Sequence, residues 1–398
     1  MPHSKASPPV SDATNAQIAH WPLVAQAAAA LAAAMGIGRF VFTPILPLME
    51  AQAGLTSQAG VGLATANYIG YLAGAVLGIV LPSLVRSQSA LRLCLIGLVL
   101  SLALMPATSS DAAWFLLRLF AGAASALVFV IAVSAMLSGL SITTRHLAGW
   151  GFGGVGVGIA LTGIFVAIVR AASTWQFAWW ISAAVTATLA AAAWRLPVAR
   201  RSAPRPAARQ GAGTAKWFAA LWASYVLEGI GYIIAGTFLV AAVQYGSVGD
   251  LGSGVWTIVG VTAIPSCALW VWLARKWNGP ALLSISLFVQ AIGIALPAVV
   301  DGTVAALVAA ALFGATFMGV SALTLAIGDH LQTPYAVALL TVGFSIGQIL
   351  GPLLAAPLIH NGFQEAMLFG GIIVLGSSAV AAVLCIRFPH RAPATTAP

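Results

Sequence analysis

Charged side chains are scarce in this 398-residue sequence, because Asp, Glu, Lys and Arg together make up only 6% of it. Soluble proteins average roughly 25% charged residues. Hydrophobic residues make up 61% of the chain. A soluble chain of this length could not bury so much apolar surface, whereas in a lipid bilayer that surface needs no burial. The composition therefore excludes a soluble fold and predicts a membrane protein.

Several signatures of enzymes and binding proteins are also missing. The three cysteines, Cys94, Cys267 and Cys385, have neither metal-ligand nor disulfide spacing, and no Gly-Lys-Ser/Thr phosphate loop occurs. Residues 151–156 fit a dinucleotide fingerprint and residues 343–347 a nucleophile elbow, but neither follows a strand. The net charge of +9 comes from short loops rather than from one basic face. We expect no enzyme activity, no metal, no cofactor and no nucleic-acid partner.

Long apolar runs follow one another along almost the whole chain. A membrane-spanning helix needs about 20 such residues, about twice the length of a barrel strand. The runs do not alternate as strands would, so helices are predicted. Twelve are found, at residues 23–48, 60–82, 92–107, 112–137, 147–169, 175–195, 217–243, 253–274, 280–300, 303–327, 335–358 and 366–387.

The charges in the connecting loops alternate in sign. One set of loops carries Arg86, Arg92, Arg145, Arg195, Lys216, Arg275 and Lys276, and the other carries Glu50, Asp111, Asp250, Asp301 and Glu365. Arg170 is the one basic exception in the second set. Because basic loops stay in the cytoplasm, the pattern predicts a multi-pass protein of the inner cell membrane with both termini cytoplasmic.

The chain divides in the middle. Residues 197–216 contain three prolines and four arginines and form the only linker-like stretch. They separate a six-helix bundle at 21–196 from a second at 217–388. The polar ends, 1–20 and 389–398, are predicted to be cytoplasmic tails, the first of them disordered.

The two halves resemble each other at a near-constant offset of 193 residues. Gly36–Gly38 match Gly229–Gly231, Leu119–Phe120 match Leu312–Phe313, and Gly154 and Gly158 match Gly347 and Gly351. Parallel halves related by an axis along the membrane normal are a transporter architecture, with the solute site near mid-depth. The predicted fold is thus all-α, with twelve transmembrane helices in two pseudo-symmetric bundles of six.

This 6+6 layout, with a basic central loop and with Arg118-Leu119-x-x-Gly122 in the fourth span, resembles the major facilitator superfamily over residues 20–390. Residues 35–40 with Thr43-Pro44, residues 66–71, and Gly347-Gln348-x-x-Gly351-Pro352 resemble its YbfB/YjiJ-like branch. The resemblance implies secondary active transport by alternating access. The usual acid between the second and third spans is absent from residues 82–92, which calls into question the gating latch that this acid helps to form in relatives.

Three charged residues lie inside predicted spans, where charges cost about 2.5–3.5 kcal/mol and usually face the bundle interior. Arg39 is about 15 Å from one surface and Glu228 about 16 Å from the other, at about 1.5 Å per residue. We expect Arg39 to bind an anion or serve coupling and Glu228 to carry the coupling proton. A static ion pair between them is the alternative. Arg118 lies near enough to the outer surface to snorkel; the resemblance implies a coupling or helix-contact role.

Four polar residues are second-rank candidates for contact with the solute: Asn67, Tyr71, Tyr232 and Gln348. The alternative for each is a hydrogen bond between helices. The partners predicted are protons, the lipid bilayer and a small solute, more consistent with an organic anion or a zwitterion than with a cation. The predicted function is proton-coupled secondary transport of a small organic solute, and the alternative is a non-transporting sensor or scaffold on the same fold.

Overall fold

The computed structural model describes residues 10–140, 144, 147–170, 173–198, 214–245, 252–331, 333, 336–359, 362–386 and 388. Most of the predicted linker 197–216, the predicted tail 389–398 and the loop residues Arg145 and Asp250 lie outside this part. Within it, the regular elements are helices. They are α1 Val10–Leu31, η1 Ala32–Arg39, α2 Phe42–Ala53, α3 Ser57–Val80, α4 Pro82–Val85, α5 Gln88–Leu104, η2 Met105–Ala107, α6 Asp111–Gly139, α7 Ala148–Arg170, α8 Trp175–Ala193, α9 Ala215–Tyr245, α10 Gly252–Leu273, α11 Gly279–Val299, α12 Thr303–His330, α13 Ala336–Ala355, η5 Ala356–Leu358 and α14 Gln364–Val383.

Twelve helical segments of the described part are long and apolar enough to cross a membrane, as the sequence predicted. Several ends differ from the prediction. α1 begins at Val10, so helix already covers residues expected in the disordered tail 1–20. The third span begins at Gln88 rather than at residue 92, because Ser87 caps the helix by accepting a hydrogen bond from the backbone of Ala90.

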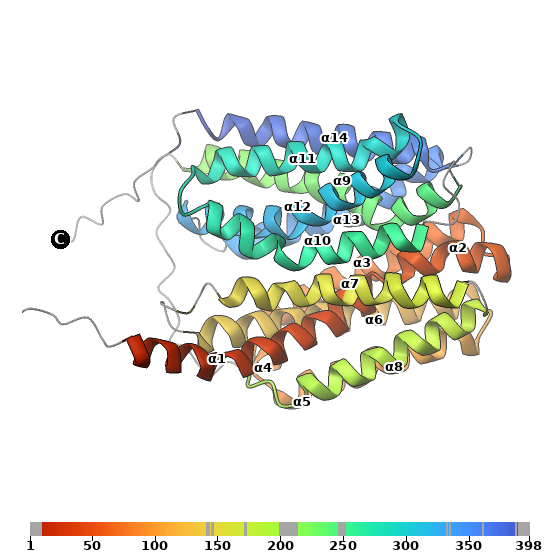
Figure 1. Cartoon of the computed structure of the whole chain (residues 1–398), viewed down its shortest axis with the longest axis horizontal. Helices are drawn as coiled ribbons and strands as arrows, with labels where there is room; N and C mark the ends of the chain where they lie inside the picture. Colours follow the sequence, from red (N-terminus) through yellow and green to blue (C-terminus); the bar gives the residue numbers. More distant parts are fainter. Residues whose placement is uncertain are drawn as a thin grey trace, which may run out of the picture.

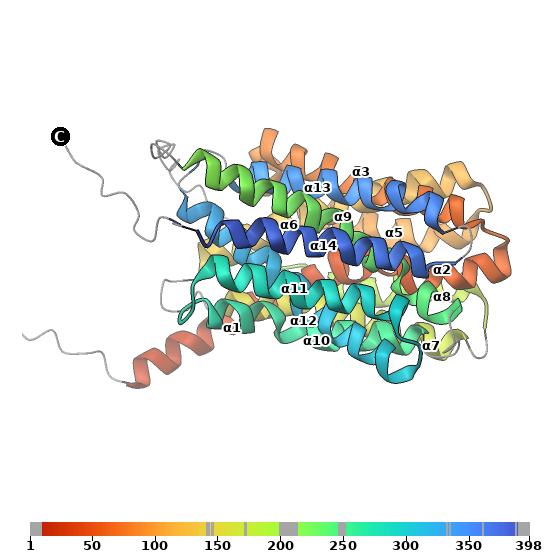
Figure 2. The ribbon, with the colours of Figure 1, turned by 90° about the horizontal axis from the view of Figure 1, so that it is seen from above.

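The helices form two groups. Figure 1 shows α9–α14, in green to blue, on one side of α1 and α4–α8, in red to yellow-green. Figure 2 gives the perpendicular view, in which the long helices run roughly parallel. The groups meet where α7 packs on α10 and α3 on α13. Trp256 on α10 donates a 3.2 Å hydrogen bond to Thr162 on α7 across this junction.

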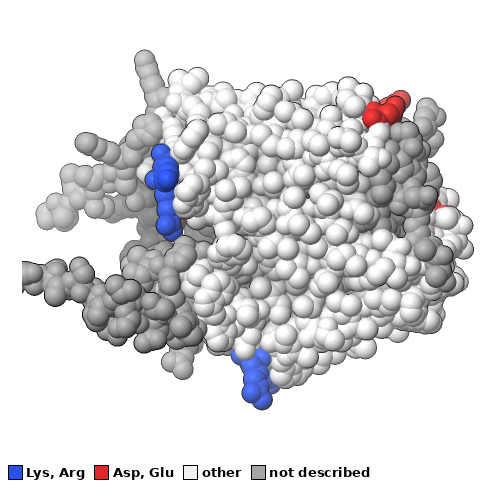
Figure 3. Space-filling model, viewed as in Figure 1, with Lys and Arg blue, Asp and Glu red and all other residues white. Residues whose placement is uncertain are grey.

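The two ends of the bundle differ in charge. We call the end where α1 begins the basic end; it carries Arg86, Arg92, Arg195, Lys216, Arg275 and Lys276. The opposite, acidic end carries Glu50, Asp111, Asp301 and Glu365, while Asp329 is an acid at the basic end. Figure 3 shows the same separation on one face. Which end faces the cytoplasm stays a prediction.

Equivalent glycines pack the equivalent helices of both halves. A methyl group on Gly36 of η1 would lie 2.6 Å from the Cα of Gly158 on α7. In the other half, one on Gly347 of α13 would lie 2.4 Å from the carbonyl oxygen of Val226 on α9. The repeated glycines therefore let α7 pack against η1, and α13 against α9, at distances that leave no room for a larger side chain.

The first span of each half lies at the centre of the molecule. The most apolar window of His20–Ala53 is 94% buried and that of Ala215–Gln244 is 89% buried, against 39–61% for the other ten spans. These central spans carry Arg39 and Glu228. Both side chains therefore lie in the interior rather than facing lipid, with 2% and 1% of their surfaces exposed.

Candidate functional site

The first span is irregular at its middle. It is a π-helix from Ala32 to Arg39 and resumes as α-helix at Phe42. Pro44 accounts for the break, because proline lacks an N–H and its ring displaces the carbonyl four residues earlier, that of Phe40. π-Helical turns often occur at functional sites. Arg39 is therefore the last residue of the π-helix. The backbone carbonyls at this end, those of Gly38 and Arg39, need hydrogen-bond donors from elsewhere.

Arg118 supplies those partners. Its Nη1 donates to the carbonyl of Gly38 at 3.2 Å and its Nη2 to that of Arg39 at 3.0 Å. The side chain is 2% exposed, so it does not snorkel to the surface. Asn67 on α3 donates in turn to the Arg118 carbonyl at 3.0 Å. Arg118 and Asn67 therefore hold the irregular helix in place from α6 and α3.

Arg39 points across the junction of the halves. Its Nη2 donates to Oε1 of Gln348 on α13. The guanidinium lies 4.2 Å from the ring centre of Tyr71, with Tyr68 and Phe40 at 5.3 and 5.1 Å. Since arginine only donates, Gln348 must present its oxygen. The Gln348 amide nitrogen, Arg39 Nε and the Ser345 hydroxyl are buried without a hydrogen-bond partner.

Glu228 does not neutralise Arg39. Its Oε1 accepts a 3.3 Å hydrogen bond from Gln290 on α11, and its Oε2 has no hydrogen-bond partner. No Arg39–Glu228 ion pair forms between these two described residues. The static pair considered from sequence is therefore absent from this conformation.

Aromatic rings line the same region. Tyr232 stacks on Phe313, Phe317 and Phe344 at centroid distances of 5.8, 5.7 and 5.6 Å. Phe40, beside Arg39, meets the edge of Tyr232 at 6.4 Å. The interior thus brings together the Arg39 guanidinium, the Glu228 carboxyl group, the Gln290 and Gln348 amides and a group of stacked rings.

Hydrogen bonds join the two halves in the region between Arg39 and the acidic end of the bundle. Thr43 donates to the carbonyl of Gly236. The Tyr68 hydroxyl lies 2.8 Å from Thr237, and it is the donor because the Thr237 hydrogen goes to the carbonyl of Ile233. Glu228, Gln290 and Gln348 are each 1% exposed or less. These side chains are closed to solvent from both ends.

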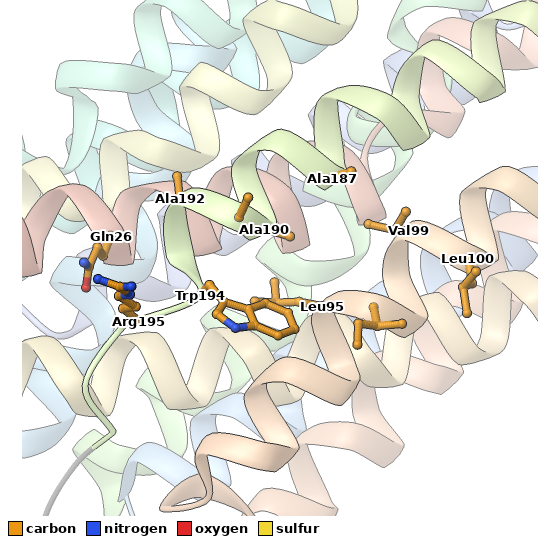
Figure 4. A pocket seen from close by; sticks show the side chains of 11 residues that line it. Gln26, Leu95, Val99, Leu100, Ala187, Ala190, Ala192, Trp194 and Arg195 are labelled. Carbon is orange, nitrogen blue, oxygen red and sulfur yellow. The ribbon is translucent and has the colours of Figure 1, made fainter.

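Two cavities in the described part lie elsewhere. One of about 540 Å³ lies between α5 and α8, with Gln26 of α1 in its lining, and Figure 4 shows this lining. The other, of about 360 Å³, lies beside α10 and is lined by Trp150 and Trp272. Neither contains Arg39 or Glu228. Among the described residues, no group of three His, Cys, Asp or Glu side chains could hold a metal ion.

The structure brings Arg39, Tyr71, Tyr232 and Gln348 to one region and places Arg118 and Asn67 behind it as supports. Sequence reasoning missed the partner of Glu228. Gln290 is a buried amide in a span whose other polar side chains are two serines, and a lone amide there was the available signal. It also missed Ser345, whose residue type is common in membrane helices, and the ring partners Phe317 and Phe344.

Two transporters are among the solved structures with a similar fold. The nucleoside transporter NupG has a TM-score of 0.66 at 14% identity, covering 94% of this chain and 99% of its own; a point mutant of it gives 0.68 at 16%, covering 91% and 99%. The human organic anion transporter MFSD10 (TETRAN) gives 0.60 at 14%, covering 91% and 98%. These likenesses establish the fold.

The family model described as "Uncharacterised MFS-type transporter YbfB" matches residues 31–385. The chain belongs to this family: it is a multi-pass membrane transporter and not an enzyme, as predicted. No curated protein matches it.

Proposed function

We propose that this transporter moves a small organic anion, or a zwitterion bound through its acidic group, by alternating access coupled to protons. The observation that carries the proposal is the state of Arg39. Arg39 is 2% exposed and has no ion pair with a described acid. Its Nε and the neighbouring amide nitrogen of Gln348 are donors without an acceptor. A buried charge without a counter-ion is costly, and an anionic solute would supply both the charge and the acceptors.

The Glu228–Gln290 contact supports proton coupling. The Gln290 amide donates to one Glu228 oxygen, while the other Glu228 oxygen and the Gln290 oxygen both lack a donor. Two bare oxygens in one buried pair repel each other when the acid is ionised. A proton on Glu228 Oε2 could instead donate to Gln290, giving a neutral acid–amide pair with two hydrogen bonds. In this proposal the closed conformation holds Glu228 protonated.

The arrangement of the halves supports alternating access. Among the described residues, Thr43 and Tyr68 hydrogen-bond the first half to α9 at the acidic end, and the α7–α10 and α3–α13 contacts run between the halves. Rocking of one bundle against the other would open the Arg39 region first to one end and then to the other. The charge asymmetry supports placing the basic end in the cytoplasm of a cell with an inner membrane.

Transport by energised membrane vesicles tests the proposal. We would screen small aliphatic and aromatic mono- and dicarboxylates, with neutral amides of matched size as controls, with and without an uncoupler. We expect saturable flux of at least one carboxylate and not of its amide, lost in Arg39→Gln. Glu228→Gln should retain carboxylate exchange but lose its acceleration by a proton gradient. Flux that is indifferent to carboxylate charge would refute the anion assignment, and unchanged proton dependence in Glu228→Gln would refute the coupling role.

A further inference from the structure

The larger lateral cavity has two chemically different ends. It has a volume of about 540 Å³, within the range of about 300–1,000 Å³ usual for ligand sites. Figure 4 shows Gln26 and Arg195 near one end, Val99 and Leu100 at the other, and Trp194 between them. Apart from Gln26, Trp194 and Arg195, its lining is aliphatic. An occupant must therefore be apolar over most of its length and polar at one end.

The cavity opens towards lipid. On α5, Ile96 is 43% and Leu100 53% exposed. The polar end lies at the basic end of the bundle, where α8 stops at Ala193. From there to Ala187 the cavity follows α8 inward for about 9 Å, at about 1.5 Å per residue. Its depth thus matches the span from the headgroup level into the hydrocarbon.

Two cationic side chains lie at the polar end, Arg195 in the lining of the cavity and Arg92 beside the lining residue Trp194. Arg92 donates through Nε to the Trp194 carbonyl at 3.4 Å, and its guanidinium lies 5.1 Å from the Trp194 ring centre. Gln88 donates to the same carbonyl at 3.1 Å. Arg195 itself lines the cavity. Two guanidinium groups around an interfacial tryptophan suit an anionic headgroup.

The second lateral cavity repeats this chemistry at the same end. It is lined by Trp150, Trp272 and Arg275 together with apolar side chains, and the Lys276 ammonium lies 4.8 Å from the Trp272 ring centre. Both described cavities therefore join an apolar wall to a tryptophan and a cation in one leaflet.

We infer that the α5–α8 cavity is a binding site for an anionic phospholipid of the leaflet at the basic end. The acyl chain lies along Leu95, Val99 and Ala187, and the phosphate faces Arg195 and Arg92. A zwitterionic lipid would place an ammonium group beside the two cations, and a free phosphate would leave the apolar part without an occupant. The site is separate from Arg39, so it does not depend on the proposed transport.

Lipid binding by the purified full-length chain in an uncharged detergent tests this site. The probes are dioleoyl phosphatidylglycerol, dioleoyl phosphatidylcholine with the same chains, and glycerol phosphate as the headgroup alone. Native mass spectrometry counts bound lipid, and the thermal unfolding midpoint reports stabilisation. We expect phosphatidylglycerol to be bound preferentially and to raise the midpoint more than phosphatidylcholine does, with no effect of glycerol phosphate.

Paired variants locate the site. Arg195→Gln should weaken phosphatidylglycerol binding about five-fold, the effect of about one charge at the membrane surface, while Arg86→Gln, at the same end but outside the cavity, should not. Ala187→Phe should block the chain, while Ala184→Phe, on the exposed face of α8 outside the cavity, should not. Equal binding of both lipids, binding of glycerol phosphate alone, or variants that match their controls would each overturn the assignment.

Discussion

At the residue scale, the account depends on how few buried charges the interior holds and on what each one contacts. Arg39, Arg118 and Glu228 are all buried, yet only Arg118 has its charge placed against backbone carbonyls of the irregular helix. Arg39 and Glu228 each use one side-chain amide and leave other atoms without partners. We therefore propose a structural role for Arg118 and roles in binding and coupling for the other two residues.

Arg118→Leu should destabilise the protein because it leaves the carbonyls of Gly38 and Arg39 without donors. We expect a loss of about 1–3 kcal/mol in the free energy of unfolding, the range for an unsatisfied buried polar group. Arg118→Lys should lose less, since one ammonium can still reach one carbonyl. Thermal unfolding of the purified variants measures this, with the partly exposed Arg92→Gln as the control. Wild-type stability in Arg118→Leu would contradict the supporting role.

Gln290→Met should remove the hydrogen bonds of the protonated Glu228 carboxyl group while the carboxyl group itself stays in place. Infrared spectroscopy of the purified protein detects the carbonyl stretch of a buried carboxylic acid, and Glu228→Gln identifies the band by its loss. Because Met neither donates nor accepts like an amide, we expect the band to move to higher frequency in Gln290→Met. Ser286→Ala, one turn earlier on α11, should leave the band in place. An unmoved band in Gln290→Met would rule out the acid–amide pair.

At the element scale, glycines set the distance between the first and fifth helices of each half. Gly36 against Gly158 and Gly347 against Val226 leave no room for a methyl group. Gly376 on α14, by contrast, has no atom within 4 Å of an added methyl. The same residue type therefore has opposite consequences at different positions.

Gly158→Ala should force α7 away from η1, since its methyl would meet the Ala32 carbonyl oxygen at 2.5 Å. We expect a destabilisation of about 1–3 kcal/mol, as for overpacked interiors. Gly376→Ala should be neutral or stabilising by up to about 1 kcal/mol, because alanine favours helix. Thermal unfolding of the two variants compares them directly. Equal midpoints would show that the contact does not set the helix spacing.

The number of helices was predictable because the bilayer sets the length of each span and the charge of each loop. The division into two halves was predictable because the glycine repeat marked equivalent helices in each half. The π-helix was not, and neither were the hydrogen bonds that Arg118, which is far away in sequence, donates to the carbonyls at its end. The candidate residues Arg39 and Glu228 were predictable from the cost of charge in lipid. Their partners Gln348 and Gln290 required the packing of α13 and α11, which no spacing in the sequence encodes.

At the scale of the whole molecule, hydrogen bonds between described residues join the two halves in the region between Arg39 and the acidic end. Thr43–Gly236 and Tyr68–Thr237 are two of them, each joining the first half to α9. Such bonds stabilise the closed arrangement relative to one open towards the acidic end.

The double variant Thr43→Val, Tyr68→Phe should favour opening at the acidic end. Each bond between membrane helices contributes about 0.6 kcal/mol, so we expect the open population to rise about seven- to eight-fold. The rate at which an impermeant thiol reagent labels Ser345→Cys from that end reports the change. Thr188→Val, which loses only a bond within an exposed turn of α8, is the control. A labelling rate that does not rise in the double variant would show that these bonds do not hold the halves closed.

The most direct test of the account is the accessibility of Ser345 from each end of the transporter. Ser345 is fully buried, one turn before Gln348, and its hydroxyl has no partner. With Cys94, Cys267 and Cys385 replaced by alanine, we would label Ser345→Cys with an impermeant thiol reagent in vesicles of both orientations. Ser377→Cys, within the second bundle, is the control. Alternating access predicts labelling of Ser345→Cys from both sides and none of Ser377→Cys; labelling from neither side, or from one side alone, would contradict it.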